Sequence, residues 1–326
     1  MFSFSDVYGH EIIISSLKKA LVTGNHAHAY IFDGVSGIGK SKIADIFARA
    51  LQCELNLKPC NECISCRASL AFNHPDIRYV KPKGAALGVD DIREQVNAAA
   101  HIRPYQYKYK VFILDSADKM TREAQNALLK TLEEPPSYAV FLLISQSLHN
   151  FLPTIISRCV TLRLKPLPLK QVEGYLTERG YDALESLAAA SAGGGSIGKA
   201  LLLVADEDFR AERKELVNIL NNLPDSSLWD ILLLARQLEK FKDNSARMLS
   251  FMQLWYRDAL AYKATGQAAY FMQRDLGQGL ETFSRGMSFK KLVAGANSII
   301  SAGQSLRFNG NYLLTMEIML MKMSGF

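Results

Sequence analysis

The first half of the chain alternates short, unbroken apolar runs with segments whose apolar residues recur at helical spacing. Residues 29–32, 110–114 and 139–145 are the apolar runs, and their length predicts buried strands. Residues 76–80 and 159–164 are two further predicted strands. Strands of this kind, alternating with helices, indicate a mostly parallel sheet that is covered on both faces.

Helices are predicted before and between these strands. Apolar residues at helical spacing predict helices over residues 12–21, 41–51 and 89–100. A fourth helix begins after Thr121, a residue whose hydroxyl makes a good N-cap, and it ends before Pro135. The first half is therefore expected to form an α/β domain.

The pattern changes after residue 165. Residues 166–168 read Pro-Leu-Pro and form a stiff connector, after which strand patterns vanish. Glycines at 193–195 break the chain before a helix that begins near Ser196. From residue 208 to the end the sequence is helical and rich in Leu, Ile and Met, and its methionine cluster is expected to fill a core or an interface. The second half is expected to be all helical.

Composition limits the class of protein. The chain has 326 residues, of which 48% are hydrophobic and 21% charged, as expected of a globular protein with two or three domains. No apolar run approaches the roughly 18 residues of a membrane span, and the first residues do not form a secretory signal, so a cytoplasmic location is expected. The net charge of +6 permits contact with a polyanion without requiring it.

The strongest motif spans residues 34–41 and reads Gly-Val-Ser-Gly-Ile-Gly-Lys-Ser. It fits the phosphate-binding P-loop and stands between a predicted strand and a predicted helix, the context that this motif needs. Gly34, Gly37 and Gly39 let the backbone wrap around phosphates, and the helix N-terminus attracts their charge. Lys40 is expected to reach the β- and γ-phosphates and Ser41 to bind Mg²⁺, so ATP with Mg²⁺ is the expected ligand.

An acidic residue ends one of the buried strands. Asp115 follows the apolar run 110–114, the pattern that holds Mg²⁺ in nucleotide-hydrolysing proteins of this class. Many of these carry a glutamate next, which polarises the attacking water, but here the next residue is Ser116. A serine cannot act as a carboxylate base, and Asp118 stands two residues further on. The pocket is therefore expected to bind nucleotide and to cleave it poorly.

Four of the five cysteines lie within residues 53–66. Cys53, Cys60, Cys63 and Cys66 provide four thiolates, which satisfy tetrahedral Zn²⁺ and leave no position for water, so the expected site is structural. An iron–sulfur cluster is the alternative and a redox dithiol a weaker one. Cys159 lies outside the cluster and is expected to be a plain buried thiol.

The tripeptide Ser157-Arg158-Cys159 precedes the last predicted strand. Arg158 is open to two interpretations. It is either an ordinary surface residue or an arginine finger, which stabilises charge on a phosphate held by a neighbouring subunit.

Taken together and in this order, the motifs resemble those of bacterial DNA polymerase III clamp-loader subunits of the AAA+ class. The resemblance covers about residues 4–205, and the helical remainder is similar only in length and character. The residues that carry it, besides the P-loop and the cysteines, are His28-Ala29-Tyr30-Ile31-Phe32, His74-Pro75-Asp76, the strand that ends at Asp115, the run from Asn126 to Pro136, and Ser157-Arg158-Cys159.

The resemblance implies a fold and a set of partners. It implies an AAA+ P-loop NTPase core with a RecA-like parallel sheet over residues 1–165, with the zinc module 53–66 inserted, a small helical lid over 166–207 and an all-helical oligomerisation collar over 208–326. It also implies that the chain joins gamma/tau and delta subunits in a five-membered ring. This ring opens a sliding clamp and places it on primer-template DNA, and the ring contacts the phosphates of that DNA. The resemblance implies no membrane partner. Arg158 is then the finger that completes a neighbour's ATP site. Lys108 and Lys110 are candidate DNA contacts.

Three departures from the ATP-hydrolysing members of this family favour a member that hydrolyses little or no ATP. Ser116 replaces the glutamate, and Gly198 stands where the motor's sensor arginine is expected, with Lys199 only a partial substitute. The chain also ends at residue 326, without the long extension of some motor members. The intact P-loop leaves two alternatives open, a hydrolysing gamma/tau-type subunit and an unrelated P-loop kinase.

Overall fold

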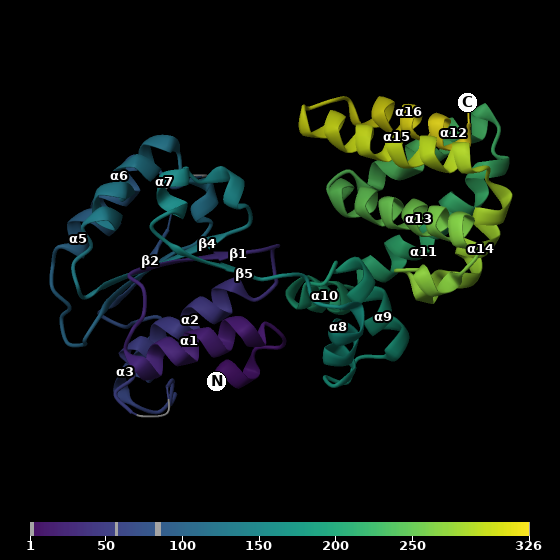
Figure 1. Cartoon of the computed structure of the whole chain (residues 1–326). Coiled ribbons are helices and arrows are strands. Elements are labelled where there is room, and N and C mark those ends of the chain that lie inside the picture. The colour runs from purple at the N-terminus through teal and green to yellow at the C-terminus, as the bar shows by residue number, and fades with distance from the viewer. Residues whose placement is uncertain (1–2, 56–57, 82–85, 326) are drawn as a thin grey trace. The chain divides into compact units, whose positions relative to one another are not determined.

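The computed structural model describes residues 3–55, 58–81 and 86–325 and divides the chain into two compact units (Figure 1). The first unit comprises residues 1–167 together with 196–198, and the second comprises 168–195 together with 199–326. This division into two does not test the three domains that the sequence predicts, and their boundaries at 165 and 207 stay predictions.

The first unit is built on a five-stranded parallel sheet. Its strands are ordered β2-β3-β4-β1-β5, and every neighbouring pair is parallel, as the apolar runs predict. In sequence order the strands are β1 (Ala29–Asp33), β2 (Ile77–Val80), β3 (Lys110–Leu114), β4 (Ala139–Ser145) and β5 (Val160–Arg163).

Both faces of the sheet are buried, because alternate side chains along a strand enter two separate cores. In β1, Tyr30 and Phe32 enter one core, and Ala29 and Ile31 enter the other. Burial on both faces is the physical reason why the strands read as unbroken apolar runs.

The helices of the first unit follow the predicted segments closely. On one face of the sheet lie α1 (Glu11–Thr23) and α2 (Lys40–Gln52), which contribute to the core that contains Tyr30 and Phe32 (Figure 1). The elements that contribute to the other core are α4 (Val89–Ile92), η2 (Arg93–Asn97), α5 (Ala98–Ala100), α6 (Arg122–Glu133) and α7 (Pro153–Ile156). Shorter elements are η1 (Phe4–Asp6), α3 (Ile64–Leu70), η3 (Ala117–Lys119) and η4 (Leu148–Asn150).

Two details refine the predictions. The Thr121 hydroxyl accepts a hydrogen bond from the backbone N–H of Ala124 at 3.2 Å, which confirms the predicted N-cap of α6. The helix predicted over 89–100 is interrupted, because η2 is a π-helical turn between α4 and α5. Apolar spacing alone cannot reveal such a turn, since one inserted residue preserves the general helical pattern.

The second unit is helical throughout its described residues, as predicted. Its main helices are α8 (Leu169–Thr177), α9 (Ala183–Ala192), α10 (Ile197–Ala205, which begins in the first unit), α11 (Glu207–Asn222), α12 (Leu228–Gln237), α13 (Ser245–Thr265), α14 (Gly277–Gly286), α15 (Phe289–Arg307) and α16 (Tyr312–Ser324). Short turns of 3-10 helix join some of them: η5 (Leu223–Asp225), η6 (Leu238–Phe241), η7 (Ala268–Tyr270) and η8 (Arg274–Leu276).

The core of this unit centres on α13, where Trp255 and Tyr256 are fully buried. Met316, Met319 and Met323 pack into the same core from α16, so the methionine cluster is structural filler. No helix among the described residues combines the length and the apolar character that crossing a membrane requires.

Candidate functional site

The predicted P-loop lies where β1 ends and α2 begins. Three of its glycines have positive φ angles, 154° at Gly34, 75° at Gly37 and 108° at Gly39, which residues with a side chain rarely adopt. At Gly34 a Cβ would also lie 2.6 Å from the carbonyl oxygen of Leu164. The glycines are therefore needed both for the path of the loop and for its close approach to the residue that follows β5.

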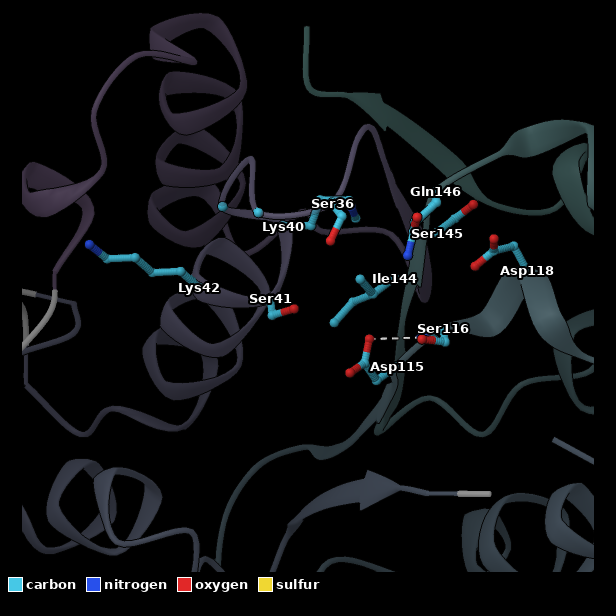
Figure 2. Close-up of a pocket in the computed structure, with 12 residues that line it drawn as sticks. Ser36, Lys40, Ser41, Lys42, Asp115, Ser116, Asp118, Ile144, Ser145 and Gln146 are labelled. Atoms are coloured by element: carbon cyan, nitrogen blue, oxygen red, sulfur yellow. Dashed lines mark hydrogen bonds between the residues drawn. The ribbon is translucent and has the colours of Figure 1, made fainter. Parts of the chain in front are cut away.

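A cavity of about 340 Å³ opens beside this loop (Figure 2). It lies at the carboxyl ends of the parallel strands, the usual place for ligands in such sheets. The predicted residues Gly37, Gly39, Lys40, Ser41 and Asp115 all line it, whereas Gly34 does not. The other lining residues are Ser36, Lys42, Ser116, Asp118, Ile144, Ser145 and Gln146.

Lys40 is held within the loop itself. The residue is 6% exposed, and Nζ donates hydrogen bonds to the carbonyl oxygens of Gly34 at 2.6 Å and Val35 at 2.8 Å. The ammonium thus lies near the N-terminus of α2, where backbone N–H groups and the helix dipole also attract negative charge. In contrast, the neighbouring Lys42 extends away from the pocket and donates to the carbonyl oxygen of Asp6 at 2.8 Å.

Asp115 and Ser41 lie on facing walls of the pocket (Figure 2). Asp115 directly follows β3, and its Oδ1 accepts the backbone N–H of Ser116 at 2.7 Å. Ser116 has a positive φ of 51°, so the chain turns sharply at the position where many hydrolases carry their glutamate. The arrangement offers a hydroxyl and a carboxylate, which are ligands suited to Mg²⁺.

Asp118 contributes a second carboxylate to the pocket wall. The residue is 9% exposed, and its Oδ1 accepts no hydrogen bond from the described residues. Burial without a partner is unfavourable for a carboxylate oxygen. The sequence showed only that Asp118 is close to Asp115, and its burial in the pocket wall could not be foreseen.

Asp45 lies on α2, close enough to Asp115 for their charges to interact. Burial raises its pKa to about 6, although a hydrogen bond from Tyr79 and the charge of Arg49 oppose the shift, and the nearby charge of Asp115 adds to it. Asp45 was not identified from the sequence, because on a helix that covers a sheet a half-buried aspartate follows no motif.

A short segment far along the chain contacts the P-loop. Ser196 Oγ donates to the carbonyl oxygen of Ser36, and the N–H of Gly198 donates to that of Gly37, both at 2.9 Å. At Gly198 a Cβ would lie 2.6 Å from the same carbonyl oxygen of Gly37. The sequence singled out Gly198 only as a missing arginine, whereas the structure uses the absence of a side chain for a close backbone contact.

The four clustered cysteines meet in space. The sulfur atoms of Cys53, Cys60, Cys63 and Cys66 lie within 4.8 Å of one another, and those of Cys60 and Cys66 are 3.8 Å apart. Four thiolates at about 2.3 Å around one tetrahedral ion would be about 3.8 Å apart, so the cluster fits a metal. The cluster can hold a metal ion, as the sequence predicts.

Backbone amides support the sulfur atoms. The N–H of Cys63 and that of Glu62 donate to Cys60 Sγ at 3.3 and 3.4 Å. Burial opposes ionisation of Cys60, but the hydrogen bonds from these amides and from the thiols of Cys63 and Cys53 together lower its pKa to about 7, whereas burial raises the pKa values of Cys53 and Cys66. A bound cation would supply the charge that the two buried thiolates need.

His74 and Asp76 connect the cysteine module to the sheet. His74 Nε2 is 3.1 Å from Ser65 Oγ, which in turn donates to the carbonyl oxygen of Gln52 at 2.9 Å. The carboxylate of Asp76 accepts backbone N–H groups of residues 105, 106 and 107 at 2.6, 2.9 and 3.0 Å. These two residues of the sequence motif therefore have structural roles.

Arg158 follows α7 and does not line the pocket of its own chain. Its side chain is 35% exposed, and Nη2 forms an ion pair with Glu133 Oε1 at 2.8 Å. Nη1 donates to the carbonyl oxygen of Thr154 at 2.9 Å. The guanidinium is therefore held at the surface by residues of α6 and α7, and the contact with Glu133 is one that the sequence did not reveal.

Three other predictions concern single residues. Cys159 is partly rather than fully buried, so it is less enclosed than predicted, and this burial raises the pKa of its thiol to about 12, as expected of an inert thiol. Lys110 is 4% exposed and its Nζ donates to the carbonyl oxygen of Ile102, so it is not a surface residue that could contact DNA. Lys108 is exposed and its contact with DNA stays a prediction.

Comparison with known proteins identifies relatives along most of the chain. The family model "DNA polymerase III, delta subunit" matches residues 9–168, and "DNA polymerase III, delta subunit, C terminal" matches residues 207–324. The chain is 32% identical to DNA polymerase III subunit tau of Bacillus subtilis, over 80% of this chain and 50% of that one. It is 34% identical to subunit tau/gamma of Haemophilus influenzae, over 74% and 38%.

A third relative matches over nearly its whole length. The chain is 28% identical to DNA polymerase III subunit delta' of Bacillus subtilis, over 96% of both chains. By contrast, it spans half or less of the length of the tau-type relatives described above.

Proposed function

Because this chain belongs to the DNA polymerase III delta-subunit family, we propose that it is a delta prime subunit of the clamp loader. In this role it helps to load the sliding clamp onto primed DNA during replication. The observation that carries the proposal is a pocket with a complete P-loop and Asp115 but with Ser116 in the place of the water-polarising glutamate. The match with a delta' subunit over 96% of both chains supports the same conclusion.

The pocket has the groups that bind ATP with Mg²⁺. The backbone N–H groups at the start of α2 face incoming phosphates, and Lys40 exchanges its carbonyl partners for phosphate oxygens. Ser41 and Asp115, which both line the pocket, would hold Mg²⁺, and the ion would neutralise phosphate charge. Without a carboxylate next to Asp115, the attacking water is not activated, and the chain's own turnover is weak or absent.

Arg158 acts on a neighbour. It lies outside its own pocket and keeps its guanidinium partly exposed, as required of a residue that completes an ATP site in another subunit. An arginine finger is worth roughly 10³–10⁵ in rate in well-studied systems. A subunit that hydrolyses little ATP thereby becomes necessary for hydrolysis by the ring.

The metal is Zn²⁺ in a structural role. Four thiolates close the coordination shell, and the spacing of the sulfur atoms fits a tetrahedral ion. An iron–sulfur cluster stays the alternative, since it takes the same ligands.

The partners follow from the family. The chain assembles in the cytoplasm with gamma/tau and delta subunits into a five-membered ring, which acts on the sliding clamp and on primer-template DNA. Residues 1–165 form the nucleotide-binding core, 166–207 the lid and 208–326 the collar through which the ring assembles.

The test replaces Arg158 in a ring reconstituted with its gamma/tau and delta partners. We expect Arg158→Ala to lower the ATP turnover stimulated by clamp and primed DNA by about tenfold or more, because the finger of one active site is lost. Arg163→Ala, which removes another exposed arginine from the same unit, should leave turnover unchanged. ATP turnover at the wild-type rate in a ring that carries Arg158→Ala would refute the role of Arg158 as an arginine finger.

A gamma/tau-type subunit is the second candidate, because the P-loop is intact and the identity to the tau/gamma subunit of Haemophilus influenzae is 34%. It predicts brisk hydrolysis by the isolated chain that Lys40→Ala abolishes, whereas a delta prime subunit shows almost none. An unrelated kinase is not supported, since the family models also account for residues 207–324.

A further inference from the structure

We propose that Glu133 is the positioning residue of the arginine finger. Its carboxylate holds the Arg158 guanidinium in the orientation in which it meets a phosphate in the neighbouring subunit. This inference rests on the proposed role of Arg158 and adds a residue that no sequence motif assigned.

The guanidinium has two points of attachment. Nη2 pairs with Glu133 Oε1 at 2.8 Å, and Nη1 donates to the carbonyl oxygen of Thr154 at 2.9 Å, with Ser157 Oγ further away at 3.4 Å. Glu133 is the last residue of α6, and Thr154 belongs to α7. Two contacts to different nitrogen atoms fix the plane of a rigid guanidinium, whereas one contact would leave it free to rotate.

The attachment leaves donors for a ligand. A guanidinium has five N–H groups; the two hydrogen bonds use those of Nη1, and Nη2 meets the Glu133 carboxylate as an ion pair. The N–H of Nε and one N–H of Nη2 have no acceptor among the described residues. They are the donors that an oxygen of a neighbour's phosphate can accept.

Glu133 is itself well placed to orient another side chain. Its backbone is fixed because Thr131 and Leu132, the two preceding residues, are 3% and 1% exposed. Its carboxylate adds to the partial negative charge at the C-terminal end of α6, and both attract the cation of Arg158. The side chain nevertheless remains 48% exposed, so it does not seal the guanidinium away from a partner.

The expected loss of rate distinguishes the positioning role of Glu133 from the finger role of Arg158. Ion pairs as exposed as this one stabilise a structure only slightly. Loss of Glu133 therefore leaves Arg158 present but less ordered, and we expect a loss of about three- to tenfold in rate. The loss of the finger itself is larger, in keeping with its greater contribution.

The experiment compares Glu133→Gln, Glu133→Asp and Glu134→Gln in the reconstituted ring with gamma/tau and delta. Glu134 is the matched control, because it is exposed and adjacent and forms no ion pair among the described residues. We expect Glu133→Gln to lower kcat for ATP hydrolysis about three- to tenfold with KM for ATP unchanged, since the finger stabilises charge in the transition state rather than the bound ATP of the ground state. Glu133→Asp should recover part of kcat, and Glu134→Gln should match wild type.

The same Glu133→Gln change in an Arg158→Ala background should have no further effect, because the residue to be positioned is gone. The positioning role of Glu133 is wrong if Glu133→Gln leaves kcat unchanged or raises it. It is also wrong if Glu133→Gln lowers kcat equally with and without Arg158. Thermal unfolding and ring assembly of each variant confirm that the fold is intact. If Arg158→Ala alone has no effect, the proposed finger fails and positioning fails with it, whereas an effect of Arg158→Ala without one of Glu133→Gln overturns positioning only.

Discussion

Asp45 shows how burial changes the chemistry of a single residue. Its position on α2 places the carboxyl group near Tyr79 and the carboxylate of Asp115. Burial is the main reason why its pKa rises from an ordinary value of 3.8 to about 6. Ionised Asp45 is thus less favourable in the folded protein than in the unfolded chain.

This shift predicts a specific dependence of stability on pH. Below about pH 4 the group is protonated in both states, so ionisation costs the folded state nothing; stability is then lost as the pH rises from about 4 to about 6. Asp45→Asn removes this loss, because the amide cannot ionise. At pH 8 we expect the variant to be more stable than wild type by on the order of 1–2 kcal/mol, reduced from the full shift by solvent screening.

Urea unfolding of both proteins between pH 4 and pH 8 measures this difference. The gain should shrink towards pH 4, and Asp243→Asn, at an exposed site, should show no such trend. A gain that is independent of pH would show that the amide acts by packing rather than by removing a charge.

Among the elements, the cysteine module is the one whose proposed stability comes more from hydrogen bonds to sulfur and from metal binding than from apolar packing. Cys63 caps α3, and its Sγ accepts the N–H of Cys66 at 3.4 Å, so one side chain serves both the helix and the cluster. The proposed Zn²⁺ links this turn to Cys53 at the end of α2. Ligand thiols must lose their protons to bind a metal, so retention of metal weakens as the pH falls.

We expect metal analysis of the protein purified without chelator to give about one Zn²⁺ per chain, and Cys63→Ser to lose it. The loss should lower the thermal midpoint of the first unit, because metal binding contributes to folding of such modules. Cys159→Ser, outside the cluster, is the control and should keep its metal. A wild-type protein without metal would contradict the assignment.

The spacing of apolar residues located most elements of the first unit well. It failed for elements whose conformation depends on tertiary contacts. The strands and α2 were predicted within one or two residues, because most of their apolar residues face a core. The π-helical turn η2 and the short helices α3 and α7 were not predicted. Short or irregular elements bury too few residues for a pattern, so their form depends on tertiary contacts.

At the scale of the whole molecule, the chain leaves the first unit after residue 167 and returns to it for residues 196–198. This return places Gly198 on the P-loop, with its N–H 2.9 Å from the carbonyl oxygen of Gly37. The P-loop is therefore held partly by residues 160 positions away, as the separation of Ser196 from Ser36 shows.

Gly198→Ala should release this contact, because the new Cβ would lie 2.6 Å from a backbone oxygen that has little freedom to move. We expect amide hydrogen exchange in residues 35–39 to become about tenfold faster, which corresponds to about 1.4 kcal/mol of lost protection. Gly286→Ala is the control, since nothing lies within 4 Å of the place that its Cβ would take. Unchanged exchange at the P-loop would show that the segment does not hold it.

The sequence by itself determined the parallel α/β class, the P-loop, the carboxylate after β3, the cysteine cluster and the helical second half. These features follow from local periodicity and from motifs in which neighbouring residues act together. Only the tertiary structure decided that Glu133 holds Arg158, that Gly198 contacts Gly37, and that Lys110 is buried. Each of these depends on which distant segments fold against one another, and a side chain's partners across such distances leave no periodic trace in the chain.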